Sequence, residues 1–543
     1  MKSYPSHRPA RRLAPSGVLF VIALAGILAG GWSLRRTGID HGRPHLVYHP
    51  DVAKQTLVAA RLFRGPLDIP ALFNGDAHRA LYPYGTAVML GYGARAAAVV
   101  TGDDALGNVH RWVWALRMRY LVSLLFLAAT AAVCVFVYAR FGPLPALLGG
   151  LFLVTEPTIA QYSHYGMNDV PLAALLLLAW SAAGLMAREP RRVPVFSALA
   201  GFALGLAFGT KYQAVLAGLF PLAAWIGFAP RKGGAWLLSS VAAVAAGGLA
   251  GMLVSCPVLA SDPGYFVNTF PDFMRWQANI TGEPVSFPVK LIRNMREFGV
   301  TLSGAGRWVL PVGIVWAALA AGLRRAPNAE RVPVLAAAVF CAVLAGILLV
   351  SRDFVRSNDL VPILAFGAVL LAVPTGRALA AFGDPRWRAG SIAALLLALG
   401  VVSIFTVHSA ADSLALKRPD TRERAQRWCI ENLASGARVV RERYTLPTGR
   451  DDVTEYRTRF LADASAAKRI RRKRCDLVIT SSLAHGRFFD PRSPYYSEAD
   501  QEIYRYLRAH YERVAVFEDR DLYFAHPVVE IYGAKLRNSR IPP

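Results

Sequence analysis

The sequence predicts an all-α polytopic membrane protein of about eleven transmembrane helices, followed by a small C-terminal α/β domain. Three observations predict this fold class. First, 54% of the 543 residues are hydrophobic and the mean hydropathy is +0.34, which is more than a soluble enzyme of this size tolerates. Second, apolar runs close to the ~20 residues that cross a bilayer recur as far as residue 408. Third, the composition becomes charged and mixed from Ser409 onward.

The first span is expected from about Ser16 to Leu34, behind a basic cytoplasmic leader that comprises residues 1–15. A signal peptide has a similar charge pattern. No Ala-x-Ala cleavage site follows this run, however, and Trp32 and Arg35 are typical of an interfacial anchor. We therefore expect a retained helix.

The other spans are expected after a long loop. They are residues 119–138, 143–159, 168–186, 193–209, 211–229, 235–257, 305–323, 331–350, 359–375 and 389–407. A cytoplasmic N-terminus places the short arginine-rich links between these spans on the cytoplasmic face of the plasma (inner) membrane, as the positive-inside rule requires. The loops at residues 35–118 and 258–304 and the domain at residues 409–543 then lie outside. Together, residues 16–408 form the predicted membrane module.

The formal charge of +25 and the pI near 10.2 could indicate nucleic-acid binding. The arginines lie mostly in short links between apolar runs, where the headgroups of anionic membrane lipids are the expected partners. We therefore expect membrane lipids and no nucleic acid as partners.

Unusual polar residues gather on the predicted outer face. They are Asp51, Lys54, Arg79 and Tyr82 in the first loop, His164 and Asp169 between the third and fourth spans, Lys211 and Tyr212 between the fifth and sixth, and Arg352 and Arg356 after the ninth. Charges at membrane depth are costly, so charges that face one compartment from several hairpins predict a shared polar cavity.

Five of these residues also have a structural interpretation. Lys211 and Arg356 could reach from helix ends to the lipid headgroups, and His164 could be a packing residue. Asp169 could cap the fourth span ahead of Pro171, and Asp51 could cap a helix that begins near Val52. The residues alone leave both interpretations open.

Four short motifs carry a resemblance. They are His49-Pro50-Asp51, Tyr82-Pro83, Ser163-His164 with Asp169 five residues after the histidine, and Gly209-Thr210-Lys211-Tyr212. In this order and on one face, they resemble the GT-C glycosyltransferases, which use polyprenyl-phosphate sugars. This superfamily includes the protein O-mannosyltransferases and the transferase that adds aminoarabinose to lipid A. The resemblance covers residues 10–410.

The resemblance implies that a sugar, hexosyl or pentosyl, moves with inversion from a polyprenyl-phosphate donor to a hydroxyl of a lipid, glycan or protein acceptor. It also implies that Asp51 deprotonates or orients this hydroxyl, and that Lys211 or Arg356 stabilises the leaving phosphate. Asp169 would support the acceptor or a divalent cation, for which His49 is another possible ligand. Lys54, Arg79, Tyr82, His164, Tyr212 and Arg352 are the further expected substrate contacts.

One departure from the family pattern keeps alternatives open. Many relatives place glutamate directly after the first aspartate, where this chain has Val52. Asp51 could act alone, Asp169 could supply the second carboxylate, or the chain could be a non-catalytic component of envelope glycan assembly. A secondary transporter is a third class, but it predicts internal repeats and charges in mid-membrane.

The loop at residues 258–304 interleaves aromatic and charged residues and predicts amphipathic helices on the membrane surface. In the C-terminal domain we expect strands at residues 437–440, 477–480, 514–517 and 522–524, and helices at 421–433 and 498–510. Because this domain has no phosphate loop and no nucleophile elbow, we assign it to acceptor contact or stability. An outside location would also permit a Cys429–Cys475 disulfide.

Overall fold

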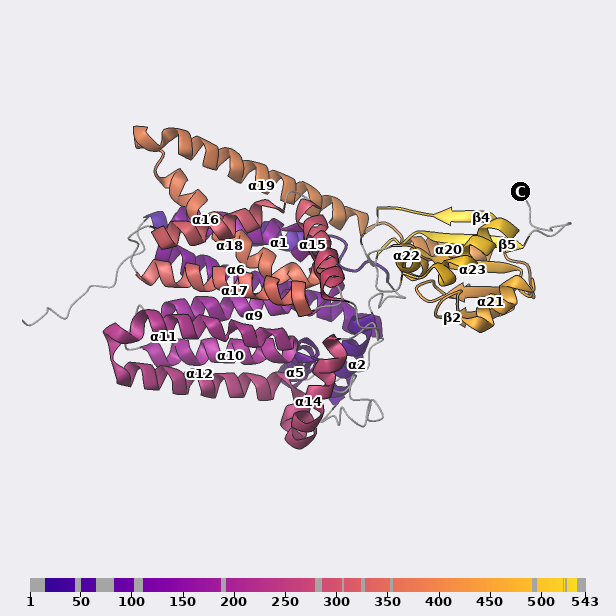
Figure 1. The fold of residues 1–543 in the computed structure, drawn as a ribbon, viewed down its shortest axis with the longest axis horizontal. Helices are drawn as coiled ribbons and strands as arrows, with labels where there is room; N and C mark the ends of the chain where they lie inside the picture. The colour runs from indigo at the N-terminus through magenta and orange to yellow at the C-terminus, as the bar shows by residue number, and fades with distance from the viewer. Residues whose placement is uncertain are drawn as a thin grey trace, which may run out of the picture.

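The computed structural model describes residues 15–43, 50–64, 83–101, 111–186, 192–278, 286–304, 307–323, 328–351, 355–490, 496–520, 522 and 525–534. A bundle of long helices is followed by a sheet domain, which lies beyond one end of the bundle (Figure 1). We call this end of the bundle the domain end and the opposite end the far end.

Seven helices of the described chain are long and apolar enough to cross a membrane. They are α1 (Pro15–Arg36), α6 (Arg111–Phe141), α10 (Val193–Thr210), α12 (Gly234–Ser255), α17 (Asn328–Ser351), α18 (Val361–Ala380) and α19 (Arg388–Ala415). An eighth span results if α7 (Pro143–Thr155) and α8 (Pro157–Tyr165), which are bent by 50° at their junction, cross together. The chain is therefore an integral membrane protein.

Shorter apolar helices occupy the other expected spans. They are α9 (Asp169–Leu185), the 3-10 helix η3 (Tyr212–Gly218) with α11 (Leu219–Lys232), and α16 (Val309–Leu323). By length and composition, the structure thus supports seven or eight of the eleven spans that the sequence predicts. Arg140 and Arg192, which belong to two of the expected basic links, lie close to helix ends at the far end.

The predicted first loop contains the helices α2 (Pro50–Arg64) and α5 (Gly85–Thr101), and α6 begins at Arg111 rather than at residue 119. The early start has a physical cause. Arg119, a charge that the hydropathy pattern places at the edge of the span, is buried because its guanidinium donates to the carbonyl oxygens of Ile39 (2.7 Å) and His41 (3.0 Å). The helix can therefore extend beyond the apolar run.

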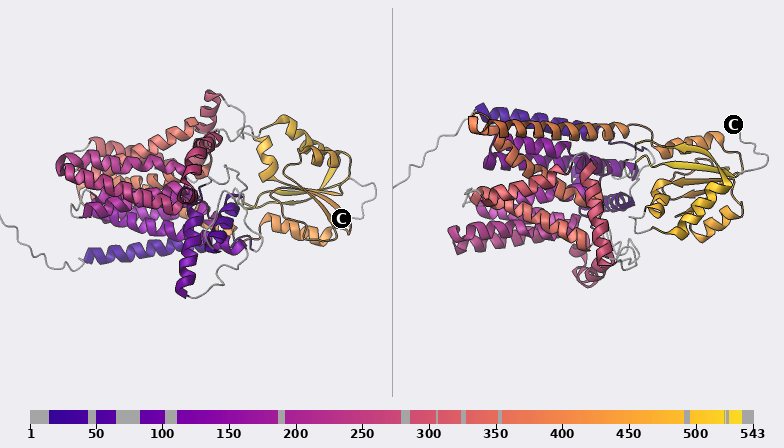
Figure 2. Two further views of the ribbon diagram at one scale, coloured as in Figure 1. Left: turned by 90° about the horizontal axis from the view of Figure 1, so that it is seen from below. Right: turned by 45° about the horizontal axis from the view of Figure 1, so that its top comes forward.

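The second predicted loop forms α13 (Pro257–Ser261), α14 (Pro263–Ala278) and α15 (Phe287–Ser303). α15 runs across the direction of the bundle helices at the domain end (Figures 1 and 2). It exposes Phe287, Val289, Ile292 and Met295. This exposed apolar face fits the predicted helix on the membrane surface.

Two neighbouring helices of the bundle, α10 and α12, are held together by glycines. A Cβ atom on Gly201 of α10 would lie 2.1 Å from the carbonyl oxygen of Val244 on α12. A Cβ atom on Gly205 would lie 2.2 Å from that of Gly248. This close backbone contact is typical of membrane helix pairs and fixes the end of α10, where Lys211 follows.

The sheet domain has five strands in the order β2-β1-β3-β5-β4. They are β1 (Arg438–Glu442), β2 (Thr454–Thr458), β3 (Leu477–Ser481), β4 (Tyr511–Phe517) and β5 (Val529–Ala534). β1 pairs in parallel with β2 and β3, and β5 pairs antiparallel with β3 and β4. The helices α20 (Thr421–Asn432), α21 (Ala464–Arg471), α22 (Ser482–Phe489) and α23 (Glu498–His510) cover the sheet.

The possible disulfide is not present, because Cys429 and Cys475 are both free thiols. Cys429 packs with Val439 and Ile479, in one of the two hydrophobic clusters of the domain. Cys475 packs with Val440 and Val478 in the other. Adjacent strand residues point to opposite faces of a sheet, so the sheet separates the two sulfur atoms.

One strand assignment and one boundary need correction. Leu522 makes only an isolated bridge to Ala525, and the last strand is instead β5, whose mixed composition hides the alternating pattern. The composition change at Ser409 falls inside α19. Ser409 continues the helix because its hydroxyl donates to the carbonyl oxygen of Thr155 (2.7 Å), and Ser413 donates likewise to Leu34 (2.9 Å).

The sheet domain contacts the bundle directly. The carbonyl oxygen of Leu522 accepts hydrogen bonds from Gln161 (3.0 Å) and from the Tyr165 hydroxyl, both on α8. Arg520 forms an ion pair with Asp412 of α19 at 2.7 Å. α8 also leads into the turn before α9, so the domain is attached next to the candidate site.

Glu442 is a fully buried acid at the end of β1. Its carboxyl oxygens accept hydrogen bonds from the backbone N–H groups of Leu461 and Ser481, at 3.1 Å each, and from the hydroxyls of Thr480 and Tyr504. Burial raises the pKa of Glu442 to about 7, because the loss of hydration opposes the charge more than these hydrogen bonds favour it.

We expect Glu442→Gln to reduce the pH dependence of the sheet domain's stability. Between its normal pKa of 4.5 and about 7, the wild-type carboxyl binds more protons in the folded state. The carboxyl therefore adds about 3 kcal/mol to the free energy of unfolding below pH 4.5, and this stabilisation is lost as the pH rises through 7. Thermal unfolding of both full-length proteins from pH 5 to 8 measures the difference.

His485 contributes a pH dependence of the opposite sign, because burial lowers its pKa to about 4. This contribution is present in both proteins and cancels in the comparison with Glu442→Gln. If the Tm of the wild type and that of the variant changed in parallel from pH 5 to 8, Glu442 would be charged throughout this range.

Candidate active site at the domain end of the bundle

Three charged side chains from separate helices meet at the domain end. Lys211 Nζ lies 2.5 Å from Asp169 Oδ1 and 2.9 Å from Asp359 Oδ1. Asp169 begins α9, Lys211 follows the last residue of α10, and Asp359 lies in the 3-10 helix η5 (Ser357–Leu360) before α18. We call these three residues the ion cluster.

The ion cluster is largely shielded from solvent. The side chains of Asp169, Asp359 and Lys211 are 3%, 8% and 18% exposed. The second oxygen of Asp169 accepts a hydrogen bond from Asn358 Nδ2 (3.1 Å), and that of Asp359 accepts one from the Arg356 backbone N–H (3.2 Å). Each carboxylate is thus fixed by the ammonium and by a second donor.

The local sequence explains why these charges lie where they do. Both aspartates are at helix N-termini, where the helix dipole favours negative charge, and Lys211 is at a C-terminus, where it favours positive charge. Pro171 and Pro362 lie in the first turns of α9 and α18 and are tolerated there, because N–H groups at these positions have no helical partner.

The first loop reaches the ion cluster through two contacts. Asn168 Nδ2, next to Asp169, donates to the carbonyl oxygen of Pro83 at 2.9 Å. Gly85, which begins α5, lies against the end of α10, and a Cβ atom there would be 2.7 Å from the backbone nitrogen of Thr210. Only glycine permits this approach.

Asp51 lies in the first turn of α2, which begins at Pro50, so it does not precede the helix as the capping interpretation assumed. α2 contacts α5, and α5 contacts the end of α10, which connects this helix to the ion cluster. Lys54, one turn later, is half-buried. The side chain of Asp51 and the residues His49, Arg79, Tyr82 and Arg352 lie outside the described residues.

Two residues that were expected to contact the substrate, His164 and Tyr212, make contacts within the protein. His164 is buried, and its ring nitrogens lie 2.8 Å from the carbonyl oxygen of Ala160 and 2.9 Å from that of Thr37. It joins α8 to the turn after α1 and presents no ring nitrogen to a substrate. Tyr212 is 8% exposed and packs its ring against Phe270 and Phe273, with ring centroids 4.9 and 5.5 Å away.

The ion cluster carries two carboxylates and one ammonium, a formal charge of 1 − 2 = −1. Lys211 is therefore already neutralised, and the cluster favours a hydroxyl donor over a phosphate. Among the residues that the structure describes, no group of three or more His, Cys, Asp or Glu side chains could hold a metal ion.

Sequence reasoning missed a second buried ion pair, in the junction between α7 and α8. The side chain of Glu156 is 0% exposed, and its oxygens accept from Arg307 Nε (2.9 Å) and from the backbone N–H of Ile159 (2.7 Å). The expected span at residues 143–159 crosses this acid. The sequence did contain a signal for this ion pair, a glutamate followed by proline within an apolar run. A charge in such a run needs a partner of opposite charge.

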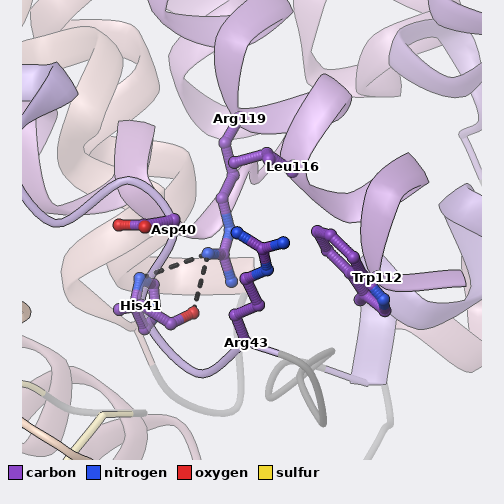
Figure 3. A pocket seen from close by; sticks show the side chains of 6 residues that line it. All are labelled: Asp40, His41, Arg43, Trp112, Leu116 and Arg119. Carbon is purple, nitrogen blue, oxygen red and sulfur yellow. Dashed lines mark hydrogen bonds between the residues drawn. The ribbon is translucent and has the colours of Figure 1, made fainter.

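A small polar cleft also lies at the domain end, beneath the turn after α1 (Figure 3). Arg119 reaches His41 from α6, and the Arg43 guanidinium carbon lies 4.8 Å from the centre of the Trp112 ring. The cavity of about 10 Å³ holds little more than one water molecule. It therefore serves to pack the turn against α6 and is too small for a sugar.

No family model and no curated relative matches the chain. Among solved structures, the apo oligosaccharyltransferase of Archaeoglobus fulgidus matches with a TM-score of 0.51 at 13% identity, over 96% of this chain and 75% of that one. The same enzyme tethered to an acceptor peptide with the NVT sequon matches at 0.50 and 11% identity, over 96% and 74%. ArnT from Cupriavidus metallidurans bound to undecaprenyl phosphate matches at 0.48 and 15%, over 95% and 98%.

The chain therefore has the fold of the archaeal oligosaccharyltransferase. This likeness agrees with the predicted fold class, a helical membrane bundle with a C-terminal sheet domain.

Proposed function

We propose that the chain is an inverting glycosyltransferase that moves a sugar from a polyprenyl-phosphate donor to an acceptor hydroxyl. The observation that carries the proposal is the ion cluster, a buried set of two carboxylates and one ammonium beside the first loop in a fold shared with an oligosaccharyltransferase. Desolvating three charges is costly, so their convergence from separate helices beside the first loop supports a functional role.

In the proposed reaction, the acceptor oxygen attacks the anomeric carbon while the bond from that carbon to the phosphate oxygen breaks. The hydroxyl proton passes to the Asp51 carboxylate, and polyprenyl phosphate leaves with the bonding electron pair. Attack from the face opposite the phosphate inverts the anomeric centre. The side chains around the reaction centre would set whether the donor sugar is hexosyl or pentosyl.

The ion cluster has a positioning role in this proposal. Its net charge of −1 suits the acceptor hydroxyl or the electron-poor sugar carbon in the transition state better than it suits the donor phosphate. Arg356, half-buried beside Asp359, is the described cation that we assign to the phosphate. No step in this proposal requires a divalent cation.

We place the domain end outside the plasma (inner) membrane and the N-terminus in the cytoplasm. The arginine-rich links at the far end support this orientation through the positive-inside rule. The sheet domain then lies outside, next to the site, where it can contact a lipid, glycan or protein acceptor.

The replacement of the family's second acid by Val52 favours one alternative, a non-catalytic component of envelope glycan assembly. Val52 is 2% exposed, so its side chain is part of the helix packing. The two functions are distinguished by comparing the glycans of cells that lack the chain with those of cells to which the wild-type chain or an Asp51 variant has been restored.

We expect mass spectrometry of envelope glycolipids and glycans to show one sugar modification missing from cells that lack the chain. The wild-type chain restores the modification, and an equally abundant Asp51→Asn variant does not, because it lacks the base. The missing mass identifies the sugar and the acceptor class. Full restoration by Asp51→Asn would contradict the role of Asp51 as the base and favour the non-catalytic alternative, and unchanged glycans in the deletion strain would contradict both functions.

A further inference from the structure

A cavity of about 520 Å³ lies at the far end, between α16, α17, α18 and α19. In Figure 1, α19 is inclined to the other bundle helices. Small side chains keep the space open, among them Ala320 of α16 and Ala393 of α19. We call this space the wedge cavity. It is as large as a typical small-molecule site.

The lining of the wedge cavity changes from charged to apolar along the bundle axis. Glu330 and Arg331 lie near the start of α17 and Arg377 near the end of α18, all at the far end. Val334 lies one helical turn deeper, and Leu397 lies nine residues into α19, or about 13 Å at 1.5 Å per residue. A ligand with a charged head and an apolar tail matches this order.

The charged mouth is positive overall. Arg377 forms an ion pair with Glu330, and its guanidinium carbon also lies 5.4 Å from the centre of the Phe141 ring. Arg331 adds a further positive charge, so the three charged lining residues sum to 2 − 1 = +1. Arg386 and Arg388, in the exposed link to α19, outnumber Asp384 there. Such a mouth favours an anionic group over a cationic one.

We propose that the wedge cavity binds an anionic phospholipid of the surrounding bilayer. The phosphate lies against Arg331 and Arg377, and an acyl chain fills the space between Val334 and Leu397. The surroundings favour a lipid, because α19 exposes Ile392 and Leu396 beside the cavity, as a helix in contact with acyl chains does. Basic pockets between membrane helices are typical sites for anionic lipid heads.

A lipid in this position would fix the inclination of α19. At the far end, α19 is joined to α18 by a hydrogen bond from the Ser391 hydroxyl to the carbonyl oxygen of Ala378 (2.5 Å). From there it runs without a break to Ala415, and its 28 residues span about 42 Å. The sheet domain follows directly. The lipid thus helps to hold the domain in place at the opposite end of the bundle.

The test is native mass spectrometry of the full-length protein in detergent with phosphatidylglycerol or phosphatidylcholine added at equal concentration. We expect one phosphatidylglycerol to be retained preferentially. Ala320→Phe with Ala393→Phe fills the wedge cavity and removes this retained lipid. Ala242→Phe, at an exposed position on α12 away from the cavity, is the matched control and retains it.

A second variant, Arg331→Gln, leaves the cavity open and separates charge from shape. It should weaken phosphatidylglycerol binding about fivefold and phosphatidylcholine binding less, because the choline cation already offsets the phosphate charge of that lipid. Equal retention of the two lipids by the wild-type protein would overturn the proposal. So would retention that is unaffected by both Arg331→Gln and the cavity-filling pair. The proposal does not depend on the proposed glycosyl transfer.

Discussion

Lys211→Met is expected to abolish sugar transfer and to destabilise the bundle by about 3 kcal/mol. The substitution leaves Asp169 and Asp359 buried with no ammonium between them, and their side chains are only 3% and 8% exposed. An uncompensated buried charge is among the most destabilising changes a protein can undergo. The apparent Tm of the purified protein and the initial rate of transfer measure the two effects separately.

The triple variant Asp169→Asn, Lys211→Met, Asp359→Asn is the matched control, because it removes all three charges and conserves their shapes. We expect it to regain most of the Tm, since no buried charge is left unpaired, but not to regain transfer. Recovery of both would assign the ion cluster to stability alone. A single Lys211→Met variant with wild-type Tm would show that the cluster does not form.

Asp51→Asn is expected to lower the rate of transfer by about 10²- to 10⁴-fold, the range typical of a lost general base. The effect should appear in kcat and not in KM, because asparagine retains the shape of the side chain but cannot accept the proton. Asp40→Asn, an exposed acid at the same end of the bundle, is the matched control and should retain activity. Equal rates for Asp51→Asn and the wild type would remove Asp51 from the reaction.

Much of the architecture could be predicted because bilayer thickness constrains helix length. The same reasoning placed Asp169 and Lys211 at one end of the bundle, since charges between apolar runs must lie near the membrane surface. The structure confirms that they meet, at 2.5 Å. It also shows helices within the predicted outer loops, where periodicity is weaker.

The pairing within the site could not be predicted, because it depends on how helices distant in sequence lie side by side. Asp359 is 148 residues from Lys211, and nothing in the sequence joins them. Arg307 and Glu156 are 151 residues apart and pose the same problem. The sequence left the role of His164 open, because its two carbonyl partners, on Ala160 and Thr37, belong to the backbone. Backbone acceptors are present everywhere in a sequence and identify no partner.

The most direct measurement is the release of polyprenyl phosphate by the purified wild-type protein in liposomes that contain a panel of polyprenyl-phosphate sugars and candidate acceptors. The proposed function predicts that release from one donor accompanies a new glycosidic bond of inverted configuration, and that Asp51→Asn releases less than about one hundredth as much. Movement of the intact donor across the liposome membrane, with no release and no new bond, would contradict it.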